Sequence, residues 1–219
     1  YMQNHRLNIP TLLMADIIHG FRTIFPIPLA LGSTWDEAAV EKMAEISAKE
    51  AAVSGLHVTF SPMVDLVRDP RWGRVMESTG EDPLLNSRLA AAMVRGYQGE
   101  NLKEDNWRVA ACVKHFAAYG GALAGRDYNT VDMSERQLRE MYLPGYKAGL
   151  DAGAKLVMTS FNTVDGIPAT GNQWLFRDVL RNEFGFEGVV ISDWGAIKEL
   201  IPHGVAKDEK QAAELAIKA

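Results

Sequence analysis

The feature that most constrains the fold is a short apolar, β-prone run that recurs along the chain and ends each time beside a polar residue. In the clearest case, residues 188–192 lead directly into Asp193 and Trp194. Such continuous runs are typical of strands buried in a parallel sheet, and α/β enzymes carry functional groups at the carboxyl ends of these strands. Asp193 is therefore a candidate functional residue, and a turn-forming Asp that caps the next helix is the alternative. Four further runs cover residues 9–15 before Asp16, 57–61 before Pro62 and Asp65, 109–113 before Lys114 and His115, and 156–160 before Phe161 and Asn162.

Helix signals separate these runs. Thr34-x-x-Glu37 and Ser134-x-x-Gln137 have the spacing of capping boxes, and Asn172 can cap a third helix. Residues 83–98 predict a fourth helix. Pro144 predicts a kink in the helix that follows Ser134. Alternating strands and helices predict parallel βα units. Five such units fit an open doubly wound sheet and an incomplete (β/α)8 barrel equally well, because a complete barrel needs eight strands and about 250 residues.

Composition narrows the class of protein. The 219 residues are 47% hydrophobic, which is enough apolar material for one globular α/β domain. The formal net charge is -5 with scattered Lys and Arg, so no basic stripe indicates nucleic acid. No apolar run approaches the ~18 residues of a membrane span. Cys112 is the only cysteine, which excludes an internal disulfide and a cysteine-based zinc site. These residues contain no signal peptide, and a chain that starts without Met leaves an upstream segment open.

Several long motifs occur in the loops and strand ends. Arg71 and Arg74 flank Trp72-Gly73 and supply planar donor groups suited to hydroxyls or a carboxylate. The motifs, in chain order, are Ala15-Asp16-x-x-His19-Gly20, Asp69-Pro70-Arg71-Trp72-Gly73-Arg74, Gly80-Glu81-Asp82, Val113-Lys114-His115-Phe116, Tyr128-Asn129-Thr130-Val131-Asp132 and Ile191-Ser192-Asp193-Trp194-Gly195. This set resembles the motifs of glycoside hydrolase family 3, and within it the bacterial periplasmic β-glucosidases. The resemblance extends from about residue 7 to residue 204.

The resemblance implies a role for each matching residue. Asp193 matches the catalytic nucleophile of a retaining enzyme, whose acid lies about 5–5.5 Å from it. Trp194 matches an aromatic residue at the entrance that stacks on the next sugar. Phe161 stands where many relatives place a sugar-binding Tyr, so one wall of the sugar pocket is expected to be apolar. The residues that match those holding the hydroxyls of the terminal sugar are Asp16, Arg74, Lys114 and His115.

The same resemblance implies the domain organisation. Residues 1–219 are expected to form part of a catalytic (β/α)8 TIM-barrel-like domain with about five βα units. The general acid/base of the relatives is a Glu from a C-terminal α/β-sandwich domain that is absent from this chain. Glu77 and Glu81 are expected to be structural. Residues 117–129 contain no His, which disfavours the N-acetylhexosaminidase branch of the family.

The function that follows is a retaining, exo-acting β-glucosidase that cleaves terminal β-D-glucosyl residues through a covalent glycosyl-aspartate. An oligosaccharide or glucoside is the expected partner, with no nucleic acid and no membrane. The expected location is periplasmic or secreted, no cofactor is expected, and a homodimer is left open. The alternatives are a β-xylosidase, a Schiff-base lyase or aldolase that uses Lys114, and a non-catalytic sugar-binding module.

Several of these residues also have simpler, structural interpretations. Lys114 could be a solvated strand-end lysine, and His115 a core histidine. Arg71 could form an ion pair with Glu81 or Asp82, and Asp65 is interpreted as a turn residue. His19 has a spacing that suits holding the loop of Asp16. A metal site built from Asp16, His19, His115 and Asp193 is disfavoured, because the chain has neither an H-x-H pair nor an H-E-x-x-H helix.

Overall fold

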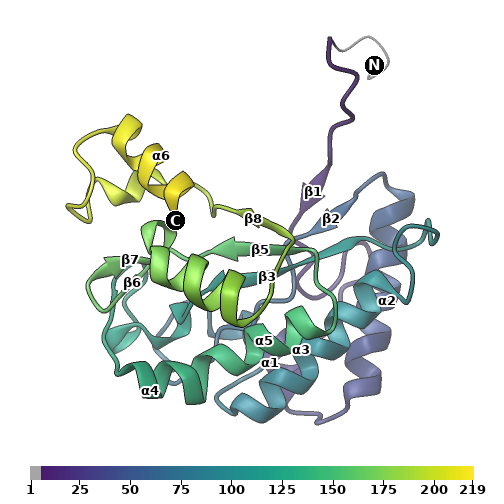
Figure 1. Ribbon diagram of the computed structural model, residues 1–219. Helices are drawn as coiled ribbons and strands as arrows, with labels where there is room; N and C mark the ends of the chain where they lie inside the picture. Colours follow the sequence, from purple (N-terminus) through teal and green to yellow (C-terminus); the bar gives the residue numbers. More distant parts are fainter. Residues whose placement is uncertain (1–5) are drawn as a thin grey trace.

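Five parallel strands form the main sheet of the structure, a computed structural model that describes residues 6–219 (Figure 1). The sheet order is β1-β2-β3-β5-β8, so neighbours in the sheet follow one another along the chain. A doubly wound sheet would reverse its order at a switch point, whereas a barrel adds each strand beside the last. The sheet is therefore a half-barrel, and the (β/α)8-like prediction is confirmed. The strands are β1 (Met14–Ala15), β2 (Val58–Thr59), β3 (Ala110–Phe116), β5 (Leu156–Thr159) and β8 (Val189–Ile191).

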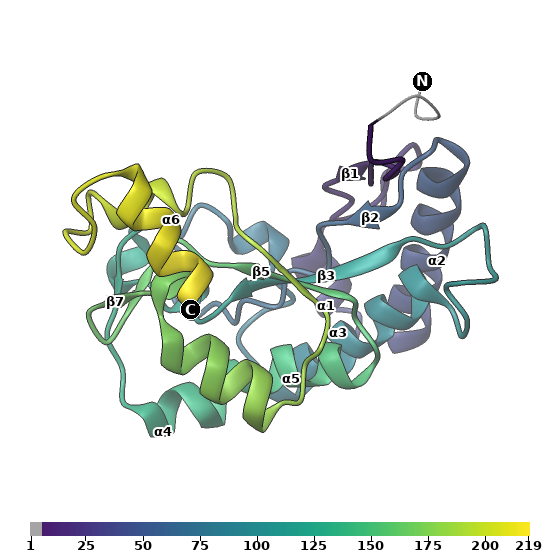
Figure 2. The same cartoon turned by 45° about the horizontal axis from the view of Figure 1, so that its top comes forward.

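Most helices lie on one side of this sheet: Figures 1 and 2 show α3 and α5 packed beneath the strands, and α6 lies away from this layer, above β5 in Figure 1. Side chains that alternate along the strands point either to this helical layer or to the inner face of the half-barrel. The helical layer contains α1 (Pro28–Gly32), α2 (Glu37–Val53), α3 (Pro83–Gln98), α4 (Glu135–Gln137), α5 (Leu143–Asp151) and the π-helical segments Leu138–Tyr142 and Trp174–Glu183, and α6 (Glu209–Lys218) follows β8. The inner face carries a smaller apolar cluster centred on Val58, Cys112, Leu156 and Met158.

The helix signals differ in accuracy. Helix α3 spans the predicted residues, and Ser134 accepts a hydrogen bond from the backbone N–H of Gln137 as expected of a cap. Asn172 Oδ1 accepts from the backbone N–H of Leu175 at 3.1 Å, so this cap is also confirmed. The capping box at Thr34 is wrong, because Asp36 caps α2 and accepts from Ala39 N. The Thr34 hydroxyl instead donates to the carbonyl of Leu31 at 2.6 Å.

The structure adds detail that the sequence patterns did not indicate. A small three-stranded sheet joins β4 (Thr130–Val131), β6 (Thr163–Val164) and β7 (Ile167–Pro168) beside the carboxyl ends of the main strands. The helix after Ser134 widens into the π-helical segment before Pro144, which marks the irregularity predicted as a kink. Strand β3 also extends to Phe116, so Lys114 and His115 belong to the strand itself.

Candidate active site

The carboxyl edge of the main sheet holds an open cavity of about 770 Å³. Asp16 directly follows β1, Lys114 belongs to β3, and Asp193 follows β8 after one intervening residue. Carboxyl ends of parallel strands meet at one edge of a sheet, which is why these residues from distant parts of the sequence converge. The cavity is lined by Asp16, Ile18, Phe60, Arg74, Glu77, Lys114, Met158, Ile191, Ser192, Asp193, Trp194 and Gly195.

Lys114 lies at the base of this cavity. Its side chain is 4% exposed, and Nζ donates to Asp16 Oδ1 at 2.7 Å. The Asp16 side chain is 62% exposed, so the other side of the ion pair faces solvent. The pair therefore presents one cation and one carboxylate to a polar ligand in the cavity. A solvated strand-end lysine does not fit this burial.

Arg74 is held beside them by a carboxylate. Its Nε and Nη2 donate to the two oxygens of Glu77 at 2.7 and 2.8 Å, and the guanidinium lies 5.6 Å from the ring centre of Tyr119. Burial alone would lower the pKa of Arg74, but the two bonds to Glu77 outweigh it and raise the pKa. The guanidinium is thus a fixed, charged donor on the cavity wall, held there by Glu77, and a purely structural role for Glu77 stays a prediction.

Asp193 contacts His115 and its own following residue. His115 Nε2 lies 3.2 Å from Asp193 Oδ2, and the backbone N–H of Trp194 donates to Asp193 Oδ1 at 2.6 Å. Burial would raise the pKa of Asp193, but His115, the Trp194 amide and Lys114 oppose it and hold the pKa below its ordinary value. The carboxylate stays ionised at neutral pH, as a nucleophile requires.

The two aromatic candidates lie in different surroundings. Trp194 is 93% exposed at the rim of the cavity, which is unusual for an indole. Phe161 is 7% exposed and is not among the cavity-lining residues. Its ring packs 4.7 Å from that of Tyr128 and 5.5 Å from that of Tyr119. Phe161 therefore belongs to an aromatic cluster behind the Arg74 wall, and its place as a sugar contact stays a prediction.

Two residues near the site differ from their sequence interpretation. Arg71 pairs with Asp69, with Nη2 and Oδ2 2.6 Å apart, rather than with Glu81 or Asp82. Asp65 is fully buried and lies against His115 instead of serving as a turn residue. A charged residue inside the apolar run Met63-Val64-Asp65-Leu66-Val67 was the available signal, since a buried carboxylate needs partners. His19 Nδ1 lies 2.8 Å from the carbonyl of Phe25, within the loop that follows Asp16, and its role in holding that loop stays a prediction.

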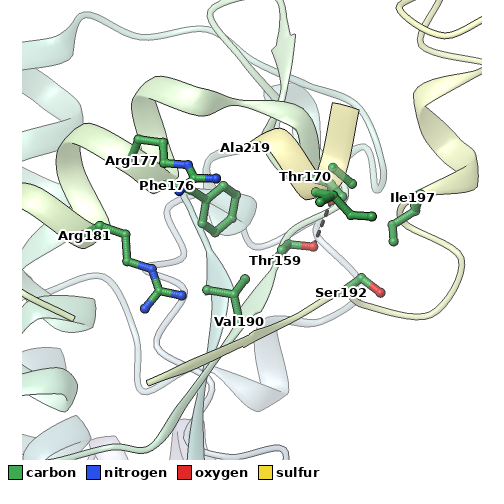
Figure 3. Close-up of a pocket in the computed structure, with 11 residues that line it drawn as sticks. Thr159, Thr170, Phe176, Arg177, Arg181, Val190, Ser192, Ile197 and Ala219 are labelled. Carbon is green, nitrogen blue, oxygen red and sulfur yellow. Dashed lines mark hydrogen bonds between the residues drawn. The ribbon is translucent and has the colours of Figure 1, made fainter. Parts of the chain in front are cut away.

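Within residues 6–219, no group of three or more His, Cys, Asp or Glu side chains is arranged to hold a metal ion. None of the helices in this range has both the length and the apolar character needed to cross a bilayer. A separate cavity of about 330 Å³ lies beside β8 and α6, where Val190, Phe176 and Arg181 line it and Thr159 bonds Thr170 (Figure 3). Asp193 does not line this second cavity, so the strand-edge cavity is the candidate site.

Comparison with known proteins identifies the family. The model of the glycosyl hydrolase family 3 N terminal domain matches residues 1–219. A periplasmic beta-glucosidase of Salmonella typhimurium is 51% identical over 98% of this chain and 28% of its own length. A beta-xylosidase of Formosa agariphila is 38% identical over 99% of this chain and 32% of its own length. The crystal structure of a beta-glucosidase from Listeria innocua in complex with glucose superposes with a TM-score of 0.98 at 63% identity, covering 99% of this chain and 30% of that one. The chain thus spans about a third or less of these relatives.

Proposed function

Because the chain belongs to glycosyl hydrolase family 3, within its N-terminal domain, we propose that the natural protein is a retaining, exo-acting β-glucosidase with Asp193 as its nucleophile. The observation that carries the proposal is the convergence of Asp16, Arg74, Lys114 and Asp193 on one strand-edge cavity. These side chains supply hydrogen-bonding charges around an ionised carboxylate, and hydrogen bonds to sugar hydroxyls that strengthen in an oxocarbenium-like state accelerate hydrolysis.

In the proposed reaction the terminal glucosyl unit enters the cavity with its hydroxyls toward Asp16, Arg74 and Lys114, which line it. His115 does not line the cavity but lies 3.2 Å from Asp193, so its direct contact with the sugar stays a prediction. Asp193 attacks the anomeric carbon, the bond to the leaving oxygen breaks, and a covalent glycosyl-aspartate forms. Water then attacks the same carbon and releases glucose with the original β configuration. Trp194, exposed at the rim, is placed to stack on the sugar that leaves.

The acid that protonates the leaving oxygen is proposed to lie outside these residues, in a C-terminal α/β-sandwich domain. In support, the two carboxylates that line the cavity besides Asp193 are already engaged: Asp16 by Lys114 and Glu77 by Arg74. The small share of the relatives' length that the chain spans also leaves room for such a domain. Residues 1–219 are accordingly proposed to be part of a (β/α)8 catalytic domain.

The relatives support the substrate class and the location. One is a periplasmic beta-glucosidase and another was solved with glucose, so we propose a β-glucoside substrate and a periplasmic or secreted site of action. A β-xylosidase is the second candidate, because the Formosa agariphila relative carries that name. The ratio of kcat/KM for matched aryl β-glucosides and β-xylosides decides between them: a ratio well above one supports the glucosidase, and the reverse supports the xylosidase.

The experiment that tests the reaction is proton NMR of the full-length protein acting on an aryl β-glucoside. Early accumulation of β-glucose supports retention, whereas α-glucose as the first product contradicts it. A lyase would instead lose activity when borohydride traps a carbonyl substrate on Lys114. The ion pair between Lys114 and Asp16 argues against that chemistry, because an ammonium held by a carboxylate is not a nucleophile. Glucose binding without any hydrolysis would indicate a sugar-binding module.

A further inference from the structure

Asp65 is a buried carboxylate for which the proposed reaction has so far no use. It follows β2 in the segment that runs beside β3, where the backbone N–H of Val64 donates to the carbonyl of Lys114 at 2.8 Å. The Asp65 side chain has no exposed surface. Burying an ionised carboxylate is costly unless hydrogen bonds compensate it, so its partners are informative.

These partners join Asp65 to His115. Asp65 Oδ2 lies 2.7 Å from His115 Nδ1 and accepts from the backbone N–H of His115 at 3.1 Å. Asp65 Oδ1 accepts from the Tyr146 hydroxyl at 2.7 Å, and the same hydroxyl lies 2.6 Å from the carbonyl oxygen of His115. Burial and then the charge of Asp65 raise the pKa of Tyr146 well above its ordinary value, so the phenol keeps its proton and remains a donor.

This arrangement fixes the ring plane of His115, whose two nitrogens face two different carboxylates. Only the imidazolium form donates from both nitrogens, with Nδ1–H toward Asp65 and Nε2–H left to face the site. That nitrogen, Nε2, is the atom 3.2 Å from Asp193 Oδ2. Tyr119 closes the side of the ring with an edge-to-face contact at 5.2 Å between ring centres. The His115 side chain is 1% exposed, so water does not compete for these contacts.

We propose that Asp65, itself held by Tyr146, is a positioning residue: it orients His115 so that Nε2 holds the Asp193 carboxylate in place for attack. The inference rests on the proposed function, because it assigns Asp65 a part in that same reaction. This role would explain why a carboxylate is buried at this edge of the sheet despite the free-energy cost of its desolvation.

The test is kinetic and uses the full-length protein with an aryl β-glucoside. Asp65→Asn keeps the shape of the side chain but removes its charge, and an amide can donate to Nδ1 as well as accept. We expect kcat to fall by about 10- to 100-fold, by analogy with the loss of a partner that orients a metal-ligating histidine. KM should change less than kcat, because neither Asp65 nor His115 lines the cavity.

The pH profile separates positioning from a merely structural role. His115 helps to hold the pKa of Asp193 low, so a misoriented His115 should let that pKa rise and move the acid limb of kcat/KM to higher pH. A general loss of packing would lower the unfolding temperature without moving that limb. The titratable and charged groups that face Asp193 or share its cavity are Asp16, Arg74, Glu77, Cys112, Lys114, His115, Tyr128 and Glu199.

Two further variants keep the test decisive. Tyr146→Phe removes only the hydroxyl and should shift kcat and the acid limb in the same direction by a smaller amount, even if Asp65→Asn fails to fold. Ser78→Ala is the control, because Ser78 Oγ donates to the backbone carbonyl of Asp65 at 2.7 Å but does not touch its carboxylate. Its kcat and acid limb should match those of the wild type.

An unchanged kcat and acid limb in folded Asp65→Asn, or in Tyr146→Phe when Asp65→Asn does not fold, would overturn the inference while leaving the proposed function standing. A wild-type protein that does not hydrolyse β-glycosides would overturn the proposed function itself. The two failures are therefore distinguishable in one series of measurements.

Discussion

The helix-covered side of the sheet and its carboxyl edge are made from the same strands but by opposite chemistry. On the covered side, α2 and α3 approach so closely that a Cβ on Gly96 would collide with the carbonyl oxygen of Glu41 and lie 2.6 Å from the Cβ of Ala44. At the edge, buried charged or polar groups are held in pairs, Lys114 with Asp16 and His115 with Asp65. The first region holds the fold together, and the second places charge where a sugar would lie. Substitutions in the two regions should therefore change different measurable quantities.

The largest effect is expected for Asp193→Asn. An amide is not a nucleophile, so turnover of an aryl β-glucoside should fall by several orders of magnitude. The unfolding temperature should shift by no more than about 2–4 °C, the change that ~1 kcal/mol gives in a domain of this size. Steady-state kinetics and thermal denaturation of the same preparation check both parts. A variant that keeps wild-type turnover would remove Asp193 from the reaction.

Lys114→Ala should have the next largest effect. It deletes a buried cation from the cavity and releases Asp16. Loss of one preorganised charged donor costs about 10²–10³-fold when the contact strengthens in the transition state. The loss should appear in kcat as well as in kcat/KM. Lys147→Ala is the matched control, since Lys147 pairs with Asp151 on an exposed helix surface and should behave as wild type. Equal behaviour of the two variants would contradict the proposed contact between Lys114 and the sugar.

Gly96→Ala tests the covered side. The added methyl group meets backbone and a neighbouring Cβ, so the two helices must separate. Overpacking of this kind costs about 1–3 kcal/mol of unfolding free energy. Chemical denaturation should show that loss, with kcat per folded molecule unchanged. Gly73→Ala is the control, because an added Cβ there meets no atom within 4 Å. A large fall in kcat for Gly96→Ala without loss of stability would contradict the claim that the helix-covered side affects stability alone.

Trp194→Ala should have a smaller effect at the rim. Aromatic stacking is worth about 0.5–1.5 kcal/mol, which corresponds to a ~2- to 10-fold rise in KM for a disaccharide. Substrates whose leaving group is a single methyl should be affected less, because they offer no second ring. Trp35, which is 73% exposed and does not line the cavity, supplies the control Trp35→Ala. If both variants bind disaccharide equally well, Trp194 is not a sugar platform.

The smallest effect is expected for Glu199→Gln. Burial, then the charges of Asp193 and Asp127, raise the pKa of Glu199, so its ionised form is disfavoured in the folded state. That penalty is full above the raised pKa and disappears below the unfolded value of about 4.3. The unfolding temperature of the variant should therefore be slightly higher than that of the wild type at pH 7 and equal to it at pH 3. A strong loss of kcat would instead identify Glu199 as the missing acid.

Sequence patterns predicted the order of the strands and the residues at their carboxyl ends, although β1 (Met14–Ala15) and β2 (Val58–Thr59) are shorter than the runs that indicated them. Each apolar run is long enough to be a strand, and parallel strands bring Asp16, Lys114 and Asp193 to one edge without further information. The pairing of Asp65 with His115 could not be predicted in the same way. It joins residues fifty positions apart through a loop whose course depends on packing against β3. The cap of α2 failed for a different reason, because Thr34 and Asp36 compete within one turn and only the backbone geometry selects Asp36.

The central claim is that Asp193 forms a covalent bond to the sugar. Incubation of the full-length protein with a 2-deoxy-2-fluoro-β-glucoside that bears a good leaving group should trap the glycosyl-enzyme, because the fluorine slows hydrolysis of the intermediate. Mass spectrometry of the digested protein should then find the 2-fluoroglucosyl group on Asp193. A label on any other carboxylate, or full inactivation without a label on Asp193, would contradict the account.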